Sequence, residues 1–286
     1  MQEPASLLSS GTAERRFGGL QRLHGGEANE RLARAHVAIA GIGGVGSWTA
    51  EALARCGVGA LTLIDLDHVA ESNINRQVHA LEATLGAAKI EAMAERIRQI
   101  NPDCRLTLVD DFVEPDNVGE VLAGPFTAIV DATDQARAKI AMILHARRHK
   151  LPLIVCGGAG GKTDPLALRA GDLSESVNDA LLARLRNELR KHHGYPRAAP
   201  AAGKAPRRVP RMHVRALWVD EPVRRPALAE PCAVPAVPAV ANDLTAPLRA
   251  AAAPQGLSCA GYGSIVTVTA AMGLAAAHEA LRHVFA

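Results

Sequence analysis

The sequence predicts an α/β fold in which a doubly wound, mostly parallel sheet carries helices on both faces. Short apolar runs that resemble buried strands alternate with segments that have the periodicity of amphipathic helices. A glycine-rich loop joins the first of these strands to a helix, and a carboxylate ends the second strand about twenty residues later. Right-handed crossovers between such strands place a ligand at the carboxyl ends of the strands.

The predicted elements follow one another closely through the first half of the chain. Residues 1–15 look like a loose polar leader, without the basic start and apolar centre of a signal peptide. The helix at 87–100 ends at Asn101 and Pro102, because proline does not continue a helix. We expect strands at 36–40, 60–65, 105–110, 128–131 and 153–156, and helices at 26–34, 47–56, 87–100 and 135–150.

The composition changes after residue 195, where Pro, Ala and Arg become dominant. We expect loops or disordered segments at 197–211 and 227–254, with a periodic run at 213–219 between them. Residues 264–279 are apolar but short and rich in Ala and Thr, which favours a buried helix over a membrane span. One domain is therefore predicted over 1–286, with a core at 16–195, a loop-rich insertion at 196–256 and a C-terminal segment at 257–286 that packs back on the sheet.

The bulk composition allows a sizeable core but identifies no ligand. The chain has 286 residues, 48% of them hydrophobic, and a formal net charge of +3. So small a basic excess does not by itself indicate nucleic-acid binding. The five cysteines include no C-x-x-C pair, which argues against a four-thiolate zinc site or a dithiol redox motif. Their odd number and scattered spacing favour a reducing compartment, so we expect a cytoplasmic protein.

The glycine-rich loop GIGGVGS at 41–47 predicts a nucleotide-binding site. Glycine allows a tight turn and a close approach of phosphate oxygens to backbone N–H groups, and the helix N-terminus adds partial positive charge. Asp65 ends the next strand, where a carboxylate can meet ribose hydroxyls. The pattern up to this point fits an NAD site equally well.

Polar residues beyond the second strand shift the prediction towards a triphosphate. Arg76 follows the Asp65 strand and can grip phosphate oxygens in a bidentate way, and Lys89 begins the following helix. A triphosphate attacked at its α-phosphorus needs such cations, because charge builds on its oxygens and on the leaving pyrophosphate. Asp134 lies just past a strand end and can hold Mg²⁺.

Each of these residues also has an ordinary structural interpretation. Arg76 and Lys89 could be solvated surface cations. Asp131 could cap the helix that follows its strand, and Asp67 could be a turn residue. Their joint order and spacing favour the functional interpretation over the structural one.

Taken together, these motifs resemble the E1-like superfamily, whose members adenylate carboxylates, and the resemblance covers residues 16–165. Within that superfamily the sequence is most similar to the tRNA threonylcarbamoyladenosine dehydratases, which cyclise this modification at position 37 of tRNA. The similar segments are RFGGLQRLHG (16–25), SNINRQVHAL (72–81), RIRQINPDCRLTLVDDFV (96–113), GGAGGKTDP (157–165) and CAGYGS (259–264).

The resemblance implies an ATP-dependent enzyme that uses Mg²⁺, with tRNA as substrate, a homodimeric state and a sulfur-relay protein as a candidate accessory. Asp134 would hold Mg²⁺ and, with Arg16, Arg76 and Lys89, would be catalytic. The carboxylate of the threonylcarbamoyl side chain would become an acyl-adenylate, and an internal nucleophile would then close a ring and release AMP. The implied ATP-binding residues are Gly41, Gly43, Gly44, Gly46, Asp65, Asp67, Asn75, Arg76, Gln77 and Lys89.

The chain departs from its relatives in two places. Molybdopterin- and thiamine-type members carry two C-x-x-C pairs, which are absent here. They also carry a second N-terminal arginine, often donated across a dimer; here Arg16 is kept, Gly19 stands at the second position, and Arg22 is a candidate substitute. The match is loose over 197–254, although WVDEP (218–222) is similar to a short acidic-proline segment of the dehydratases.

Two cysteines lie near predicted functional segments. Cys259 precedes a glycine turn and a helix, where a helix N-terminus would make a thiol reactive. The alternative, which we favour, is a small buried residue at a tight turn. Cys156 ends a strand near the predicted crevice and is expected to be packed in the core.

A basic run could supply the cationic surface that tRNA requires. A solvated, disordered loop explains the same composition equally well, and the scarcity of aromatic residues would make any RNA contact mainly electrostatic. The run comprises Arg186, Arg190, Lys191, His192, His193, Arg197, Lys204, Arg207, Arg208, Arg211 and Arg215.

Two other functions remain open at this level. One is an adenylyltransferase that activates the C-terminus of a small sulfur-carrier protein, against which the missing zinc cysteines argue. The other is an NAD-binding oxidoreductase or a regulatory nucleotide-binding module, against which Arg76, Lys89 and Asp134 argue.

Overall fold

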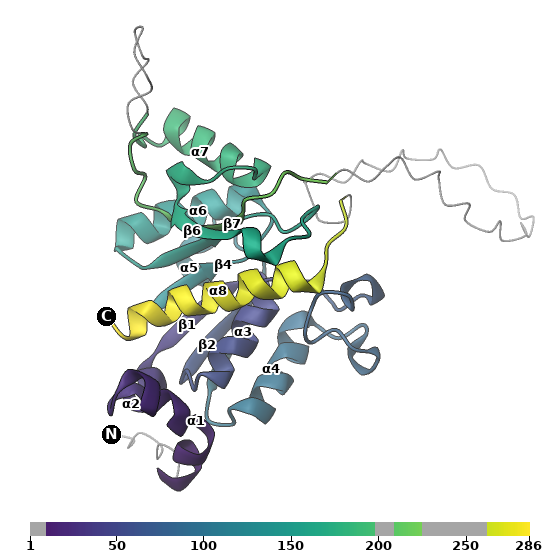
Figure 1. The fold of residues 1–286 in the computed structure, drawn as a ribbon, viewed down its shortest axis with the longest axis vertical. Helices are drawn as coiled ribbons and strands as arrows, with labels where there is room; N and C mark the ends of the chain where they lie inside the picture. The colour runs from purple at the N-terminus through teal and green to yellow at the C-terminus, as the bar shows by residue number, and fades with distance from the viewer. Residues whose placement is uncertain (1–9, 198–208, 225–261) are drawn as a thin grey trace, which may run out of the picture.

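A computed structural model of the chain describes residues 10–197, 209–224 and 262–286. Its centre is a seven-stranded sheet in the order β3-β2-β1-β4-β5-β7-β6, in which only β6 runs antiparallel to its neighbour (Figure 1). This arrangement confirms the predicted doubly wound, mostly parallel α/β fold. The strands are β1 (His36–Ala40), β2 (Ala60–Ile64), β3 (Arg105–Val109), β4 (Ala128–Asp131), β5 (Leu153–Cys156), β6 (Leu168–Asp172) and β7 (Arg215–Val219).

Helices cover both faces of the sheet. One face is packed by α3, α4 and α8, with α8 lying along α3 and across β4, β5 and β7 (Figure 1). The other face is packed by α5, α6 and α7. The helices of the described residues are α1 (Ser10–His24), α2 (Ala28–Arg34), α3 (Gly46–Arg55), α4 (Lys89–Ile100), α5 (Val118–Val121), α6 (Ala136–His149), α7 (Ala180–His192) and α8 (Val266–Val284).

The central strands form because they are apolar on both faces. Every residue of β2 and β4 is buried, which is the pattern of strands covered by helices on both sides. The edge strand β3 alternates instead between exposed and partly buried residues. The core therefore runs along β2, β1, β4 and β5, and the carboxyl ends of these strands open into a single cavity.

Several elements differ from the sequence prediction, and the short helix α5 is one that was not predicted. Residues 10–15, which we expected to belong to a loose leader, are the first part of helix α1. Strand β6 was not predicted, because its sequence LRAGD has no apolar alternation; in the structure it pairs antiparallel with β7. Helix α7 was also missed, although Asp179 is a recognisable N-cap whose carboxylate accepts a hydrogen bond from the Leu182 N–H.

The C-terminal part packs back on the sheet through α8. This helix is buried along one side against α3, and a Cβ on Gly273 would come within 2.7 Å of the Trp48 Cβ. The close approach of the two helices thus depends on a glycine. Among the described residues, none of the helices has the length and apolarity required to cross a membrane.

Candidate active site

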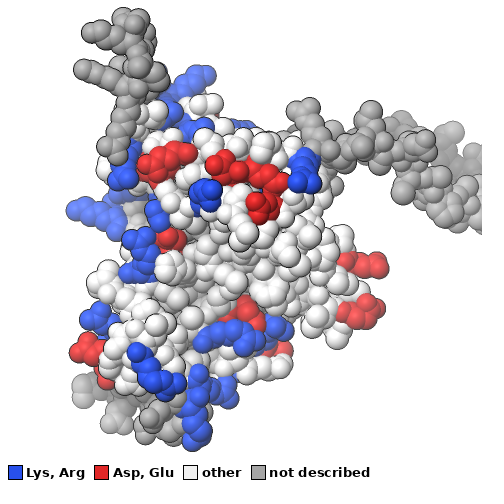
Figure 2. Space-filling model, in the orientation of Figure 1, with Lys and Arg blue, Asp and Glu red and all other residues white. Residues whose placement is uncertain are grey.

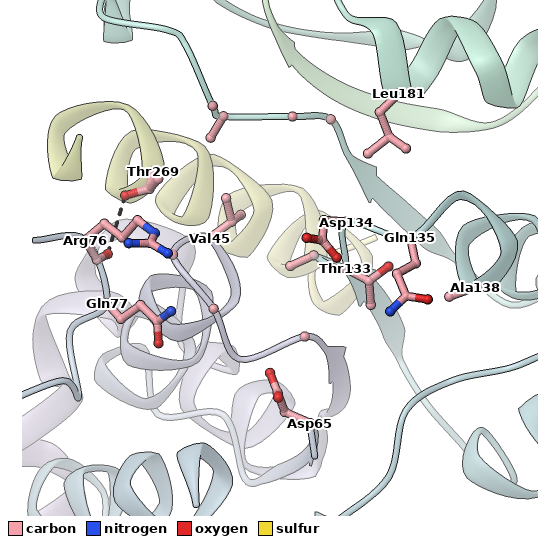
Figure 3. Close-up of a pocket in the computed structure, with 18 of the residues that line it drawn as sticks. Val45, Asp65, Arg76, Gln77, Thr133, Asp134, Gln135, Ala138, Leu181 and Thr269 are labelled. Atoms are coloured by element: carbon pink, nitrogen blue, oxygen red, sulfur yellow. Dashed lines mark hydrogen bonds between the residues drawn. The ribbon is translucent and has the colours of Figure 1, made fainter. Parts of the chain in front are cut away.

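A cavity of ≈ 480 Å³ lies at the carboxyl ends of β1, β2, β4 and β5 (Figure 3). We call one side the N-terminal wall, formed by residues between 41 and 89, and the opposite side the C-terminal wall, formed by Gly157–Gly160, Lys162, Asn178–Leu181, Val223 and Tyr262. Thr133 and Asp134 lie between the two walls. The cavity brings together nine of the predicted site residues, namely Gly41, Gly43, Gly44, Asp65, Asp67, Arg76, Gln77, Lys89 and Asp134.

The glycines of the loop serve different purposes. Gly41 has a φ of 85°, and a Cβ there would lie 2.9 Å from the carbonyl oxygen of Ala132, so both the turn and the neighbouring loop require glycine. A Cβ on Gly46 would collide with the carbonyl oxygen of Gly41. Gly46 therefore allows α3 to begin against the loop, and it does not line the cavity.

Asp65 holds the glycine loop through hydrogen bonds to backbone N–H groups. Its carboxylate accepts hydrogen bonds from the N–H of Ile42 at 2.6 Å and from the N–H of Asp67 at 2.9 Å. Burial raises the pKa of Asp65, while Lys89 and the two backbone N–H groups oppose that rise. Each carboxylate oxygen keeps a second lone pair, so the residue can still accept a hydrogen bond from a ligand hydroxyl.

Lys89 is the buried cation of the N-terminal wall. It is only 6% exposed, and its ammonium group pairs with the Asp67 carboxylate at 2.6 Å. A lysine has three N–H donors, and this pair uses one of them. Two donors remain for a ligand, because the described part of the chain offers Lys89 no second hydrogen-bond acceptor.

Arg76 and Gln77 face the same cavity from the loop that follows β2 (Figure 3). One nitrogen of Arg76, Nη1, donates to the Ser72 carbonyl at 2.6 Å and to Asn75 Oδ1 at 3.0 Å. Its Nε and Nη2 donors have no partner in the described ranges. The Gln77 side chain is buried and its Oε1 likewise has no partner there, which marks a position where a ligand donor would be accommodated.

Asn75 lies outside the cavity lining. Its amide donates to the Ser264 carbonyl at 2.9 Å, just before α8, and its oxygen accepts from Arg76. Asn75 thus joins the loop after β2 to the C-terminal segment. In a single chain Asn75 therefore has a structural contact. Its predicted role in ATP binding stays a prediction.

Asp131 and Lys139 form an ion pair beneath the turn that carries Asp134. Both side chains are fully buried, and Nζ lies 2.9 Å from Asp131 Oδ1. The same oxygen accepts from the backbone and hydroxyl of Thr133, so Asp131 fixes the 131–134 turn. The alternative prediction that Asp131 caps α6 is wrong, because Gln135 occupies the N-cap and no side-chain cap bond is made.

Asp134 is exposed on the cavity wall, and within 10–197, 209–224 and 262–286 its carboxylate has no hydrogen-bond or ion-pair partner. The described residues contain no group of three or more His, Cys, Asp or Glu side chains that could form a complete metal site. A cation here would therefore depend on Asp134 together with oxygen atoms of a ligand, which is how Mg²⁺ is usually held beside phosphates.

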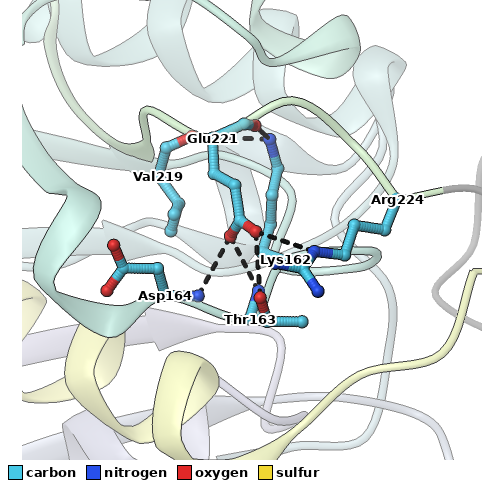
Figure 4. Close-up of polar contacts among 6 residues, drawn as sticks. All are labelled: Lys162, Thr163, Asp164, Val219, Glu221 and Arg224. Carbon is cyan, nitrogen blue, oxygen red and sulfur yellow. Dashed lines mark hydrogen bonds and ion pairs between the residues drawn. The ribbon is translucent and has the colours of Figure 1, made fainter.

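Lys162 and Glu221, whose contacts are drawn in Figure 4, had no role in the sequence analysis. Lys162 lines the C-terminal wall, and Glu221 holds the adjoining loop through the backbone N–H groups of Thr163 and Asp164. A signal was present, because both residues lie in segments that resemble the dehydratases, GGAGGKTDP and WVDEP. Neither segment has a residue pattern that by itself implies a function.

Arg16 is remote from the cavity in one chain. It lies on α1, and its guanidinium donates to the Ile100 carbonyl at the C-terminal end of α4, whereas Lys89 begins that helix at the cavity. These helix ends are roughly 16 Å apart along the axis. A catalytic role for Arg16 would therefore have to be exerted on a second copy, and it stays a prediction.

The basic run does not act as one free cationic strip. Arg186 donates to the Ser176 carbonyl at 2.6 Å, and Arg215 forms an ion pair with Glu279 at 2.6 Å. These two arginines are occupied by protein contacts. Lys204, Arg207 and Arg208 lie outside the described residues.

The cysteines of the described residues lie away from reactive positions. Cys156 is buried at the end of β5, and burial raises the pKa of its thiol to about 12, which disfavours a thiolate at neutral pH. Cys259, for which a reactive and a buried position were both considered, lies outside the described residues.

Two curated relatives are similar to this chain over most of its length. The tRNA threonylcarbamoyladenosine dehydratase of Escherichia coli (strain K12) is 43% identical over 282 residues, which is 98% of this chain and 97% of that protein. The Haemophilus influenzae protein of the same name is 40% identical and covers 82% of this chain and 86% of its own length.

Solved structures agree with these sequence matches. The crystal structure of the Escherichia coli dehydratase in complex with ATP superimposes with a TM-score of 0.77 at 38% identity, and 97% of each chain is covered. The model of the ThiF family matches residues 15–286. The chain therefore belongs to the ThiF family.

Proposed function

We propose that the protein is an ATP-dependent tRNA threonylcarbamoyladenosine dehydratase. The observation that carries the proposal is the end-to-end similarity to proteins of that name, combined with a cavity whose polar groups suit a triphosphate. An ATP complex of the Escherichia coli protein has nearly the same fold. The full-length match also favours this activity over activation of a sulfur-carrier protein and over hydride transfer.

The first step would transfer an adenylyl group to the substrate carboxylate. A carboxylate oxygen attacks the α-phosphorus of ATP, the bond to the bridging oxygen breaks, and pyrophosphate leaves. Lys89, with two free donors, and Arg76, with unpaired Nε and Nη2, would neutralise the charge that builds on the phosphate oxygens. The glycine loop would place backbone N–H groups beside the phosphates, and Asp65 would meet the ribose.

The second step would close a ring within the modified nucleoside. An internal nucleophile of the same side chain attacks the activated carbonyl, and AMP leaves with the former carboxylate oxygen. The net change is the loss of one water molecule. The protein needs to supply only proximity and the exclusion of bulk water for this step, so no cysteine of the described residues is required.

Mg²⁺ fits the carboxylate of Asp134, which has no partner among the residues that the structure describes. Asp134 is exposed to the cavity between its two walls, and Asp131 and Lys139 fix the turn on which it stands. When bound, Mg²⁺ would offset negative charge on the phosphates. We propose Asp134 as its only protein ligand among the described residues.

A homodimer in the cytoplasm is part of the proposal. The face that carries α8 has few charged side chains at its centre, and Lys and Arg lie mainly towards its edges (Figure 2). Ile265, Val266 and Leu274 of this region are exposed, and Leu274 is 52% exposed. A second copy on this face would bury them and could bring its own Arg16 towards the cavity. A sulfur-relay accessory protein remains a candidate partner.

The test is a single-turnover assay on modified tRNA. Purified protein is incubated with ATP, Mg²⁺ and tRNA that carries threonylcarbamoyladenosine, and the released nucleosides are weighed by mass spectrometry. We expect the modified adenosine to lose one water in an ATP-dependent way. An unchanged mass, with ATP–pyrophosphate exchange only after addition of a small carrier protein, would instead establish the carrier-activating reaction.

A single variant tests the metal assignment within the same assay. Asp134→Ala should abolish pyrophosphate release while leaving the fold intact, because it removes the only carboxylate proposed for Mg²⁺. Unchanged turnover of this variant would remove Asp134 from the metal site.

A further inference from the structure

Lys162 occupies an unusual environment for a lysine in an active-site wall. It is only 2% exposed, and its ammonium group donates to three backbone carbonyls rather than to a carboxylate; Figure 4 shows Lys162 beside Val219 and Glu221, which supply two of them. The acceptors are the carbonyl oxygens of Asn178 at 2.7 Å, Val219 at 3.4 Å and Glu221. These carbonyls come from the turn before α7, from the last residue of β7 and from the segment that follows β7.

The number of donors decides what this lysine can do. An ammonium group has three N–H donors, and the three carbonyls occupy all of them. Lys162 therefore has no donor left for a phosphate or a substrate carboxylate in this arrangement. Burial lowers its pKa, while the carboxylates of Asp179, Glu221 and Asp220 oppose that change. The geometry excludes a direct anion-binding role and leaves a bracing role.

Glu221 makes the reciprocal connection. Its carboxylate accepts from the N–H of Thr163 at 2.8 Å, the N–H of Asp164 at 3.0 Å and the Thr163 hydroxyl at 2.9 Å, and it pairs with Arg224 at 3.2 Å. The two backbone N–H groups are the main reason that the pKa of Glu221 falls to about 2. The 162–164 loop and the 219–224 segment are thus joined in both directions: Lys162 donates to carbonyls of the segment, and Glu221 accepts from N–H groups of the loop.

A third segment of the chain, at residues 262–263, contacts this loop at Gly161. The carbonyl of Gly161 accepts from the Arg224 N–H at 2.8 Å, and its own N–H donates to the Gly263 carbonyl at 2.9 Å. Gly161 has a φ of 69°, and a Cβ there would lie 2.7 Å from Val223 Cγ1. Val223 and Tyr262, which flank these bonds, line the cavity. The contacts around Lys162 therefore fix two side chains of the C-terminal wall.

We propose that Lys162 and Glu221 are positioning residues that lock the C-terminal wall in the shape required by the acceptor, the modified nucleoside of tRNA. This inference rests on the proposed function. Because the residues suited to ATP lie on the N-terminal wall and at Asp134, the opposite wall is left for the group that is activated. The lock acts through Val223 and Tyr262, and neither Lys162 nor Glu221 touches the reacting atoms.

The test separates the acceptor from the nucleotide. Lys162→Met keeps the length of the side chain but leaves the three carbonyls without a donor, and Glu221→Gln keeps the shape but loses the charge. For both variants we expect kcat/KM for modified tRNA to fall about 10- to 100-fold, as for a wall displaced by around 1 Å. The Kd for ATP, measured by calorimetry, should stay within about twofold of the wild-type value.

Control variants and amide exchange separate positioning from general damage. Arg34→Met removes an exposed cation that pairs with Glu30 on α2, and it should change neither parameter. Hydrogen exchange followed by mass spectrometry should show faster exchange over 157–164 in Lys162→Met and Glu221→Gln. The double variant should lose less than the product of the two single effects, because both act on one lock.

Two results would overturn the inference. One is an unchanged kcat/KM for tRNA in both variants. The other is an equal loss of ATP binding and acceptor turnover, which would mean general damage to the cavity. If the wild-type protein itself releases no dehydrated nucleoside, the proposed function fails instead. In that case amide exchange over 157–164 still tests whether Lys162 and Glu221 hold the C-terminal wall. Unchanged exchange in Lys162→Met would overturn this positioning role.

Discussion

The two walls of the cavity each contain a buried lysine, yet the two lysines are held in opposite ways. Lys89 meets a carboxylate, that of Asp67, and keeps two donors free. Lys162 meets three backbone carbonyls and keeps none. Residue type and position in a cavity therefore do not decide whether a lysine binds a ligand. The count of unused donors does.

The position of Lys89 supports its functional interpretation. It is the first residue of α4, and a cation at a helix N-terminus is unfavourable because the helix dipole is positive there. Asp67 offsets part of this cost. Such an arrangement makes sense where an anion is to be bound, whereas Lys162 donates to backbone carbonyls of the protein itself.

Lys139 is a third buried lysine, and its replacement should have the largest effect on stability. Lys139→Met leaves the fully buried Asp131 carboxylate without its partner, so we expect the free energy of unfolding at pH 7 to fall by about 3–5 kcal/mol. Urea denaturation measures the loss. Asp131→Asn combined with Lys139→Met is the matched control and should recover much of it.

The pH dependence of that loss follows from the pKa of Asp131. Burial raises this pKa, and Lys139 is the main group that opposes the rise. Without Lys139, the folded state would bind a proton at a pH where the unfolded state does not, so stability should increase as the pH is lowered through the folded-state pKa. A loss that stays constant from pH 8 to pH 5 would contradict this explanation.

Among the three buried lysines, Lys89 is the one whose replacement by Met should have the largest effect on activity, without a matching loss of stability. Removing a preorganised donor from a developing charge typically lowers the rate about 10²- to 10³-fold. We expect this loss in pyrophosphate release together with a higher Kd for ATP, unlike the Lys162 variants. Arg98→Met on the same helix removes an exposed cation and serves as control. If Lys89→Met spared ATP binding, the distinction between the two walls would fail.

Acid should weaken the contacts that Glu221 makes with the loop of the C-terminal wall. The pKa of Glu221 is depressed from 4.5 to about 2, so its contribution is complete above pH 4.5 and is lost as the pH falls towards 2. Amide exchange over 157–164, corrected for its intrinsic pH dependence, should show wild type and Glu221→Gln converging below pH 4. A difference that persists unchanged at pH 2 would contradict the assignment.

The sequence allowed the N-terminal wall to be predicted better than the C-terminal wall, for a physical reason. Gly41, Asp65 and Lys89 lie close together in sequence around the ends of β1 and β2, and their spacing follows from the strand–loop–helix geometry. Lys162 and Glu221 belong to segments that meet only after the chain has formed β6, α7 and β7. Their contacts go to backbone carbonyls and N–H groups, which leave no pattern of residue types.

Even on the better-predicted wall, the sequence could not distinguish ligands from braces. Gly46 fits the glycine-loop pattern, but its packing against Gly41 explains it. Asp131 was weighed as a helix cap, and the buried pair with Lys139 could not be foreseen because lysine is rarely fully buried. Asn75 shares a motif with Arg76 and Gln77, yet only the other two face the cavity.

Asn75→Ala should therefore have the smallest effect among these variants. The substitution removes the hydrogen bond to the Ser264 carbonyl and the support of Arg76 Nη1, and a net hydrogen bond contributes about 0.5–1.5 kcal/mol. We expect kcat/KM for ATP to fall only about three- to tenfold, with Arg76 still in place through Ser72. A loss as large as that of Lys89→Met would mean that Asn75 contacts ATP directly. The position of a side chain outside the cavity of a single chain without ligand would then not suffice to assign it a purely structural role.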